Sequence, residues 1–364
     1  MKIGILTFHR AHNYGAVLQC YALKETLRKM GHDVYVIDYR QPDIEHVYSF
    51  PRSLRLDKFI ATPFALKLSY IVKHILLDIV RIPNYFHRKG VFQRFRNKYL
   101  NLTCKVSSIP NNFDAYVIGS DMLWADDCMC GHFEKNYMGD FTHKEDSKVV
   151  AYAVSGTPKS FQKCADIYNY SFLDNFDAIS VREESLAEIV RANCKRNIHV
   201  CIDPTLLTDK DTWRPLVNNK WSNRKYILTY YLRVKGEQRI NIDKKVYSLA
   251  KTLGYEIIDL DINPVSRYLE VEDFVSVIAS AQLIVTDSFH GIIFSMIFNR
   301  PFNAICLNDS HDARYTDIIK KLGIKETLRS TEDTFFIPNI DYNIVNKNIH
   351  DFQLSSINYI EDNL

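Results

Sequence analysis

The clearest candidate for chemistry in the sequence is the run from Thr286 to Gly291, which reads TDSFHG. An apolar run precedes it and an apolar stretch follows it, so we expect a buried strand before it and a helix after it. The start of a helix presents unpaired backbone amides and a partial positive charge, and both suit a phosphate or a carboxylate. Gly291 permits a close backbone approach, and His290 can exchange a proton near neutral pH. The run therefore predicts an anion-binding loop that faces solvent and carries an acid–base residue, unless His290 is only a hydrogen-bonded structural histidine.

A second polar turn follows the apolar run at the start of the chain, where Asn13, Tyr14 and Gly15 precede an apolar stripe with helical spacing. Asn13 is a suitable residue to cap the N-terminus of that helix. The backbone around Gly15 is a further candidate for binding an anion. A dinucleotide-binding loop needs more glycines than this one, so we do not expect a nicotinamide cofactor. His9 and His12 lie just before the turn, where they either face the site or are exposed to solvent.

The run GSDMLW at 119–124 also ends an apolar strand pattern. Asp121, with Ser120 beside it, is placed to orient a substrate hydroxyl, and Trp124 is a candidate to stack on a sugar ring. The alternatives are that Asp121 caps a helix and that Trp124 lies in the core.

A single arginine, Arg182, directly follows the apolar run AISV at 178–181. Its guanidinium group can bind a phosphate or a carboxylate through two parallel hydrogen bonds. The alternative is an ion pair with Glu183, Glu184 or another acid. The residue is therefore a candidate for binding an anionic substrate at the carboxyl end of a strand.

Metal binding is not expected from the sequence. Cys128, Cys130 and His132 lack the usual two-residue separation and a fourth ligand for zinc. Asp259 and Asp261 imitate the Asp-x-Asp metal site of some glycosyltransferases, and strand alternation would point both carboxylates to one side, but we do not favour that interpretation. We therefore predict neither a metal ion nor a bound cofactor.

The chain of 364 residues is long enough for two domains, and its ordinary composition excludes wholesale disorder. Strand and helix patterns alternate along it, which predicts an α/β fold of two Rossmann-like, doubly wound domains facing a cleft. We expect the N-terminal domain at 1–208, with a basic helical insertion at about 44–108. The C-terminal domain should occupy 225–340, after a polar linker at 209–224. The tail at 341–364 should pack back on the N-terminal domain.

Charge is uneven along the sequence. Between Arg52 and Lys105 there are 12 lysines and arginines against two acids, Asp57 and Asp78. This excess favours a peripheral contact with an anionic membrane surface, and the alternative is an ordinary solvated basic face. The apolar run at the N-terminus is too short for a signal peptide, and the cysteines are scattered. We therefore expect a cytoplasmic protein, at the inner face of the membrane, with no nucleic-acid partner.

Six blocks of sequence, taken in order, resemble the polysaccharide pyruvyl transferase family. They span about residues 3–330 and comprise Asn13–Gln19 with Tyr21–Leu23, Gly119–Asp121 with Trp124, Ala151–Gly156, Ser180–Ser185, Asp203–Leu207 with Trp213, and Thr286–Gly291. The family implies a fold similar to the GT-B glycosyltransferases. It also implies phosphoenolpyruvate as the donor substrate, and a sugar or lipid-linked oligosaccharide as the acceptor that receives a ketal-linked pyruvyl group.

The resemblance also assigns roles to individual residues. His290 matches the motif histidine and would be the general acid, and Arg182 would hold the phosphate or carboxylate of the donor. The acceptor would bind on the side of the N-terminal domain and the donor on the side of the C-terminal domain. We also expect Asp121 to be catalytic, by orienting a substrate hydroxyl. Some members carry an arginine where this sequence has Ser288, and Arg314 is our candidate to replace that charge. Phe289 and Gly291 complete the motif on the donor side. Two alternative functions remain, a GT-B glycosyltransferase that uses a sugar nucleotide and a degenerate member that only binds glycans.

Overall fold

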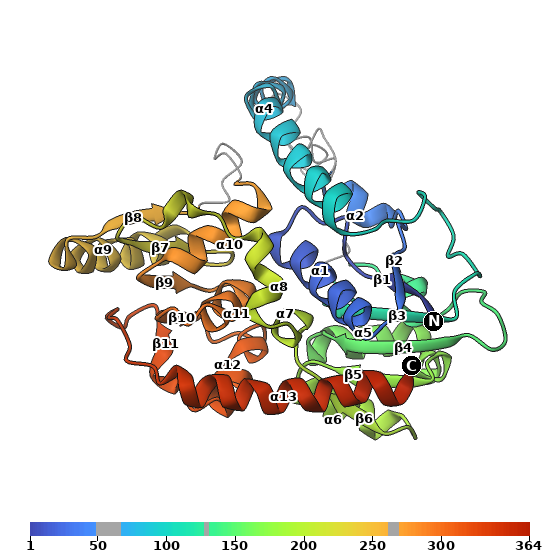
Figure 1. The fold of residues 1–364 in the computed structure, drawn as a ribbon. Helices are drawn as coiled ribbons and strands as arrows, with labels where there is room; N and C mark the ends of the chain where they lie inside the picture. Colours follow the sequence, from blue (N-terminus) through green and yellow to red (C-terminus); the bar gives the residue numbers. More distant parts are fainter. Residues whose placement is uncertain (49–66, 127–130, 261–268) are drawn as a thin grey trace.

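The computed structural model of the chain describes residues 1–48, 67–126, 131–260 and 269–364. It contains two separate β-sheets, and all the strands of each sheet are parallel (Figure 1). Two doubly wound α/β domains therefore form the protein, and the predicted fold class is confirmed.

The N-terminal sheet has the strand order β2-β1-β3-β4-β5-β6. Its strands are β1 (Lys2–Leu6), β2 (Asp33–Val36), β3 (Ala115–Asp121), β4 (Lys148–Val154), β5 (Ala178–Val181) and β6 (Ile198–Val200). In the register of the sheet, Ile3 pairs with Val34 on one side and with Ala115 on the other. The order of the strands reverses between β1 and β3, and such switch points are where doubly wound sheets bind ligands.

Helices cover both faces of this sheet. They are α1 (Tyr14–Lys29), α2 (Pro42–Val47), α4 (Lys67–Tyr99), α5 (Pro158–Tyr168), α6 (Glu184–Asn193) and α7 (Pro204–Leu207), with 3-10 turns η3 (Lys135–Met138) and η4 (Tyr170–Asn175). Val17 of α1 packs in the same core as Ile5 of β1. On the opposite face, Phe161 of α5 and Leu186 of α6 pack in the same core as Ile118 of β3. Both faces of the strands are therefore apolar, as a buried parallel sheet requires.

The C-terminal sheet has the order β11-β10-β9-β7-β8. Its strands are β7 (Tyr226–Tyr230), β8 (Glu256–Asp259), β9 (Leu283–Thr286), β10 (Phe302–Cys306) and β11 (Leu328–Ser330). The helices of this domain are α9 (Gly236–Leu253), α10 (Val271–Ser280), α11 (Phe289–Ile297) and α12 (Ala313–Lys321), with the turn η7 (Lys325–Thr327). The switch point of this sheet lies between β7 and β9, so the Thr286–Gly291 run leaves the sheet beside it.

The segment between the two sheets consists of short turns. They are α8 (Lys210–Trp213), η5 (Arg214–Leu216) and η6 (Asn219–Trp221). A continuous apolar core nevertheless joins the domains, because Tyr14 stacks on Phe274 of α10 at a centroid distance of 4.1 Å. The Tyr14 hydroxyl also donates a hydrogen bond to the Leu269 carbonyl at 2.8 Å. The first helix of one domain is thus fixed against the other domain.

The C-terminal helix α13 (Tyr342–Asn363) runs along both domains (Figure 1). At its start, the Tyr342 hydroxyl donates to the Arg300 carbonyl at 2.5 Å. Near its end, the Tyr359 hydroxyl donates to the Ala151 carbonyl of β4 at 3.0 Å. The helix therefore ties the two domains together on one side of the molecule. None of the described helices is long and apolar enough to cross a bilayer.

Candidate active site

His290 is the second residue of α11, just beyond the carboxyl end of β9. Ser288 caps this helix, because its hydroxyl accepts a hydrogen bond from the Gly291 amide at 3.3 Å. The carboxylate of Asp287 is buried and accepts the backbone amides of residues 232, 233 and 234 at 2.6 to 2.7 Å. These bonds hold the loop after β7 against the motif and fix the direction in which His290 leaves the sheet.

The imidazole of His290 packs directly on Gly15 of the other domain. A Cβ atom at position 15 would lie 2.0 Å from Nδ1 of His290, a distance that no side chain could occupy. Gly15 stands in the first turn of α1, and Asn13 caps this helix by accepting the Gly15 and Ala16 amides. The predicted cap is therefore confirmed. The two anion-binding turns that we predicted separately meet at the boundary between the domains.

The other nitrogen of His290 faces a buried carboxylate. Nε2 lies 3.8 Å from Oδ2 of Asp203, too far for a hydrogen bond, and it is buried without any hydrogen-bond partner. Burial lowers the pKa of His290 below its ordinary value of 6.5, and the charges of Asp203 and Asp121 only partly oppose this shift. The imidazole is therefore mainly neutral at neutral pH. The side chain is 13% exposed and its neighbours Ser288 and Phe289 are buried, so our expectation of a solvent-facing loop was wrong.

Asp203 links His290 to Arg182. Its Oδ2 atom accepts a hydrogen bond from Nη1 of Arg182 at 2.8 Å, and its Oδ1 atom accepts the amide and the hydroxyl of Thr205. Burial raises the pKa of Asp203, but His290, Arg182 and the bonds from Thr205 lower it further than burial raises it. Asp203 is therefore an ionised carboxylate, completely buried, between an imidazole and a guanidinium group.

Arg182 is held by a second carboxylate on its other side. Nε donates to Glu183 at 3.1 Å, and Nη2 donates to the Ser155 hydroxyl at 2.8 Å. The guanidinium group also lies over the ring of Phe289, 4.4 Å from its centroid. Burial alone would lower the pKa of Arg182, but the nearby carboxylates outweigh it and raise the pKa. The ion pair that we considered as an alternative for Arg182 is therefore present, and it is a double one.

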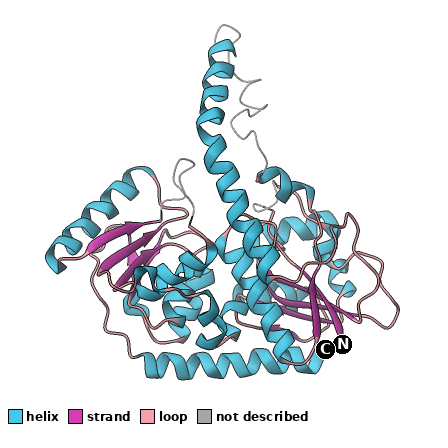
Figure 2. Cartoon of the chain, turned by 45° about the horizontal axis from the view of Figure 1, so that its top comes forward, coloured by secondary structure: helices cyan, strands magenta, loops and turns pink. Residues whose placement is uncertain are grey.

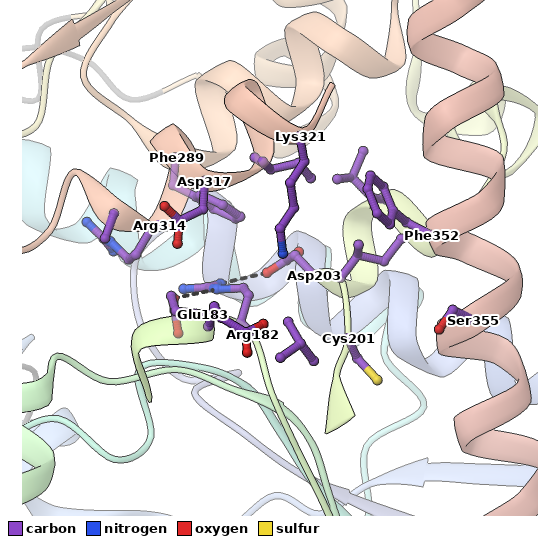
Figure 3. A pocket seen from close by; sticks show the side chains of 16 residues that line it. Arg182, Glu183, Cys201, Asp203, Phe289, Arg314, Asp317, Lys321, Phe352 and Ser355 are labelled. Atoms are coloured by element: carbon purple, nitrogen blue, oxygen red, sulfur yellow. Dashed lines mark hydrogen bonds and ion pairs between the residues drawn. The ribbon is translucent and has the colours of Figure 1, made fainter. Parts of the chain in front are cut away.

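A cavity of about 250 Å³ opens beside this cluster, between the end of β5, α12 and α13 (Figure 3). Arg182, Asp203 and Phe289 form part of its wall, and Phe352 contributes an apolar side from α13. The volume suits a small molecule rather than an oligosaccharide. Phe289 and Asp203, which adjoin His290, are among the lining residues, and His290 itself is not.

Two further cations, Arg314 and Lys321 of α12, line the cavity. Arg314 donates from Nε to the His311 carbonyl at 3.1 Å, and its Nη1 atom contacts the Met122 sulfur at 3.2 Å. In the described part of the chain, no carboxylate forms an ion pair with Arg314 or with Lys321. The Lys321 side chain extends into the cavity (Figure 3). Arg314 also lies close enough to lower the pKa of His290, so α12 brings positive charge to the site, although Asp317 of the same helix lines the cavity as well.

The family of the chain is decided by its match to a family model. Residues 13–306 match the model of the polysaccharide pyruvyl transferases. The chain belongs to this family. No curated protein sequence matches the chain.

Solved structures of other proteins are similar to this chain. A candidate UDP-N-acetylglucosamine 2-epimerase from Listeria monocytogenes is similar over 100% of this chain and 91% of its own, with a TM-score of 0.50 and 10% identity. MnaA of S. aureus, solved with UDP, covers 98% of this chain and 92% of its own at a TM-score of 0.47 and 12% identity. The glycosyltransferase SnogD from Streptomyces nogalater covers 100% of this chain and 95% of its own, with a TM-score of 0.40 and 10% identity. At 10% identity, the similarity to the Listeria monocytogenes structure shows a shared fold and nothing about activity.

Several residues of the family blocks lie in the core instead of the site. Trp124 is fully buried, packs edge-on against Phe172, and donates from its indole nitrogen to the Tyr137 carbonyl. It cannot stack on a sugar ring. Ser120 is fully buried and donates its hydroxyl to the Ala153 carbonyl at 2.6 Å. Tyr14 contacts the other domain, as described above. We predicted substrate contacts for these three residues, and the structure gives them packing roles.

Asp121 stands at the mouth of the β1–β3 switch point with a partly exposed side chain. Its Oδ1 atom accepts the Met122 amide at 2.9 Å. Its negative charge acts to raise the pKa of His290, of Arg182 and of Arg314. Asp121 therefore belongs to the same cluster of charges. The backbone at Asp121 has φ of 81°, a conformation that non-glycine residues rarely adopt.

The two loop histidines lie away from this cluster. His9 is buried and its Nε2 atom contacts Asp38 at 3.1 Å, while His12 stacks on Phe92 of α4. Asp38 also receives the guanidinium group of Arg10. Neither histidine is exposed in the way that we considered. Of the residues weighed as metal ligands, Cys128, Cys130 and Asp261 lie outside the described residues.

Sequence reasoning assigned no chemical role to three residues of the site. Asp203 directly follows the apolar run at 200–202, and that position at a strand end was the signal that could have found it. Glu183 was considered only as the partner of Arg182, although its Oε2 atom is buried and has no partner. Lys321 carried no signal, because its helix reads as an ordinary amphipathic surface helix.

Proposed function

We propose that this protein transfers a pyruvyl group from phosphoenolpyruvate to two hydroxyl groups of a sugar, forming a cyclic ketal. The observation that carries the proposal is the position of His290. Its buried Nε2 atom lacks a partner, faces the ionised Asp203, and lies within the electrostatic reach of Arg314. An imidazole nitrogen without a hydrogen-bond partner, with cations nearby, is an arrangement suited to protonating an anionic enol ester.

The reaction balances without a further reactant. A proton adds to C3 of phosphoenolpyruvate, which makes C2 electrophilic, and one sugar hydroxyl forms a bond to C2. The C2–O bond to phosphate then breaks, and the second hydroxyl closes the ketal ring. One hydroxyl proton replaces the proton given to C3, and the other leaves with the phosphate. The products are the ketal and inorganic phosphate.

In this scheme His290 delivers the first proton, which requires C3 of the donor to reach the imidazole past Phe289 and Asp203. Its pKa is lowered in the free protein, but a bound donor brings negative charge close to the imidazole and would raise the pKa again. The negative charge of Asp203, 3.8 Å from Nε2, opposes the loss of the proton from the imidazole. Proton donation at this point is expected to contribute about 10²–10⁴ in rate.

The negative charges of the donor need partners, and the candidates differ in availability. Arg182 already neutralises Glu183 and Asp203, so its net contribution of charge is small. Ser288 brings only a hydroxyl, and that hydroxyl caps α11. Arg314 and Lys321 have no carboxylate partner in the described residues, and both line the cavity. We assign the phosphate and the carboxylate of the donor to these two side chains of α12.

The test is an assay of inorganic phosphate released from phosphoenolpyruvate in the presence of sugar acceptors, with the acceptor product identified by mass spectrometry. We expect phosphate release that depends on the acceptor and equals the amount of ketal formed. Nucleotide release from a sugar nucleotide, without reaction of phosphoenolpyruvate, would instead assign the chain to glycosyl transfer. Binding of glycans with no turnover over a broad acceptor panel would indicate a degenerate member.

A further inference from the structure

Helix α4 has two halves that differ in their surroundings. Its C-terminal part packs against the body, where Val91, Phe92 and Phe95 belong to the apolar core. Arg94 forms an ion pair with Glu270 of the other domain at 2.5 Å. The rest of the helix projects away from both domains (Figures 1 and 2). The projecting half is therefore carried on a base that is anchored to both domains.

The projecting half exposes large apolar side chains. Six of them follow one another at spacings of four, three, four, three and four residues, which places them in one stripe along the helix: Leu68, Val72, Ile75, Ile79, Ile82 and Phe86. Leu76 and Val80 widen the stripe on one side. Each of the eight side chains is at least 36% exposed. A contiguous apolar surface of this kind marks an interaction site.

The same half of the helix carries an excess of positive charge. Between Lys67 and Lys89 there are five lysines and arginines and one acid, Asp78. The acid is buried, whereas Lys73 and Lys89 are exposed. The surface that the projecting half offers to a partner is therefore apolar and cationic, with its one carboxylate turned away from solvent.

Two occupants fit an apolar helical stripe, and the charge distinguishes them. A second copy of this chain could pair its own stripe in a coiled coil, but paired helices normally place opposite charges beside the seam. Two copies of this helix would bring like charges together instead. The stripe is also wider than a two-residue seam, because Leu76 and Val80 extend it. An anionic lipid surface matches both properties, since it accepts an apolar face and attracts the flanking cations.

We propose that the projecting half of α4 docks this protein on an anionic lipid bilayer, with the stripe from Leu68 to Phe86 inserted among the lipids. The proposal is independent of the reaction, because it concerns a surface that shares no residue with the candidate active site. It differs from the contact expected from charge alone, since the apolar stripe should keep a part of the binding at high salt.

The experiment measures flotation of the full chain with vesicles of phosphatidylcholine alone or mixed with phosphatidylglycerol. The triple variant Leu68→Ser/Ile79→Ser/Phe86→Ser removes three side chains from the stripe. We expect its partition coefficient on the mixed vesicles to fall at least about tenfold, because three large apolar contacts are lost. The matched control is Ile167→Ser/Ile240→Ser/Tyr247→Ser, which changes three side chains of similar exposure on α5 and α9. An equal loss in both variants, or no binding by the unchanged protein, would overturn the proposal.

A second pair of variants tests the charge. Lys73→Gln/Lys89→Gln should weaken binding to the mixed vesicles about tenfold and reduce its dependence on salt, whereas Lys225→Gln/Lys251→Gln should not. Equal binding to neutral and anionic vesicles contradicts the proposal. So does a concentration-dependent dimer that the triple serine variant abolishes, because that result assigns the stripe to a second copy of the chain. Circular dichroism of each variant establishes that it is folded.

Discussion

Two regions meet at the cavity, and each contributes an arginine. One arginine is held in ion pairs with carboxylates, and the other is not. On the N-terminal side, Arg182 is clamped between Glu183 and Asp203, and all of its nitrogens donate to the protein. On the C-terminal side, Arg314 of α12 donates to a carbonyl and contacts a sulfur, and among the described residues no carboxylate forms an ion pair with it. Both are arginines at the wall of one cavity. The difference teaches that residue type and strand position do not reveal whether a charge is available to a ligand.

His290 lies between the two regions, and its loss should have the largest effect on the reaction. We predict that His290→Gln lowers kcat for phosphate release at least about 10²-fold, because the proton donor is gone while the side-chain volume is nearly kept. Its melting temperature should stay close to that of the unchanged protein. Turnover at the original rate in this variant would remove His290 from the mechanism.

Arg182 should matter most for stability. Arg182→Met leaves Glu183 and Asp203 as buried carboxylates without a cation, so the free energy of unfolding should fall by roughly 3–5 kcal/mol. The matched control is Arg191→Met, which breaks an exposed ion pair with Glu184 and should cost less than about 1 kcal/mol. Urea unfolding measures both values. If the two variants were equally stable, the clamp would not be structural, and the comparison of the two regions would fail.

Arg314 should instead affect the donor. We predict that Arg314→Gln raises the KM for phosphoenolpyruvate about tenfold, because one charge-assisted hydrogen bond is lost, and changes the stability little. Lys320→Gln is a suitable control, since it removes an exposed charge from the same helix outside the cavity. Steady-state kinetics of phosphate release give both values. An unchanged KM in Arg314→Gln would show that Arg314 of α12 does not bind the donor.

The smallest expected effect is a shift in the pH dependence of kcat/KM. The proton donor must be protonated in the free protein, so activity should fall as the pH rises through the pKa of His290. Because burial lowers that pKa, we expect the fall to be centred below pH 6.5. Asp203→Asn removes one charge that raises the pKa and should move the fall to still lower pH. A profile that falls only well above pH 6.5 would show that another group donates the proton.

The sequence was sufficient for the fold and for part of the site. Alternating strand and helix patterns predicted two parallel sheets, and Asn13 was found as the cap of α1, because caps and periodicity depend on residues close in the chain. Contacts between distant segments were not predictable in the same way. The approach of His290 to Gly15 depends on how the two domains pack, and no local pattern encodes it.

The errors have physical causes as well. Trp124 follows a strand end as a binding residue would, but its large apolar surface is better satisfied among Phe161, Phe172 and Phe176. The direction of a side chain after a strand is set by the backbone, which the sequence did not specify. The sequence also could not predict whether the guanidinium group of Arg314 is left to bind an anionic ligand, since that depends on which acids lie close to it in the folded chain.

A crystal structure of the protein with phosphoenolpyruvate bound is the most direct test of the account. We predict that the carboxylate or the phosphate lies within hydrogen-bond distance of Arg314 or Lys321, with C3 facing His290, while the bonds from Arg182 to Glu183 and Asp203 remain intact. A donor bound away from α12, or one that takes Arg182 from its two carboxylates, would contradict the assignment of the cations.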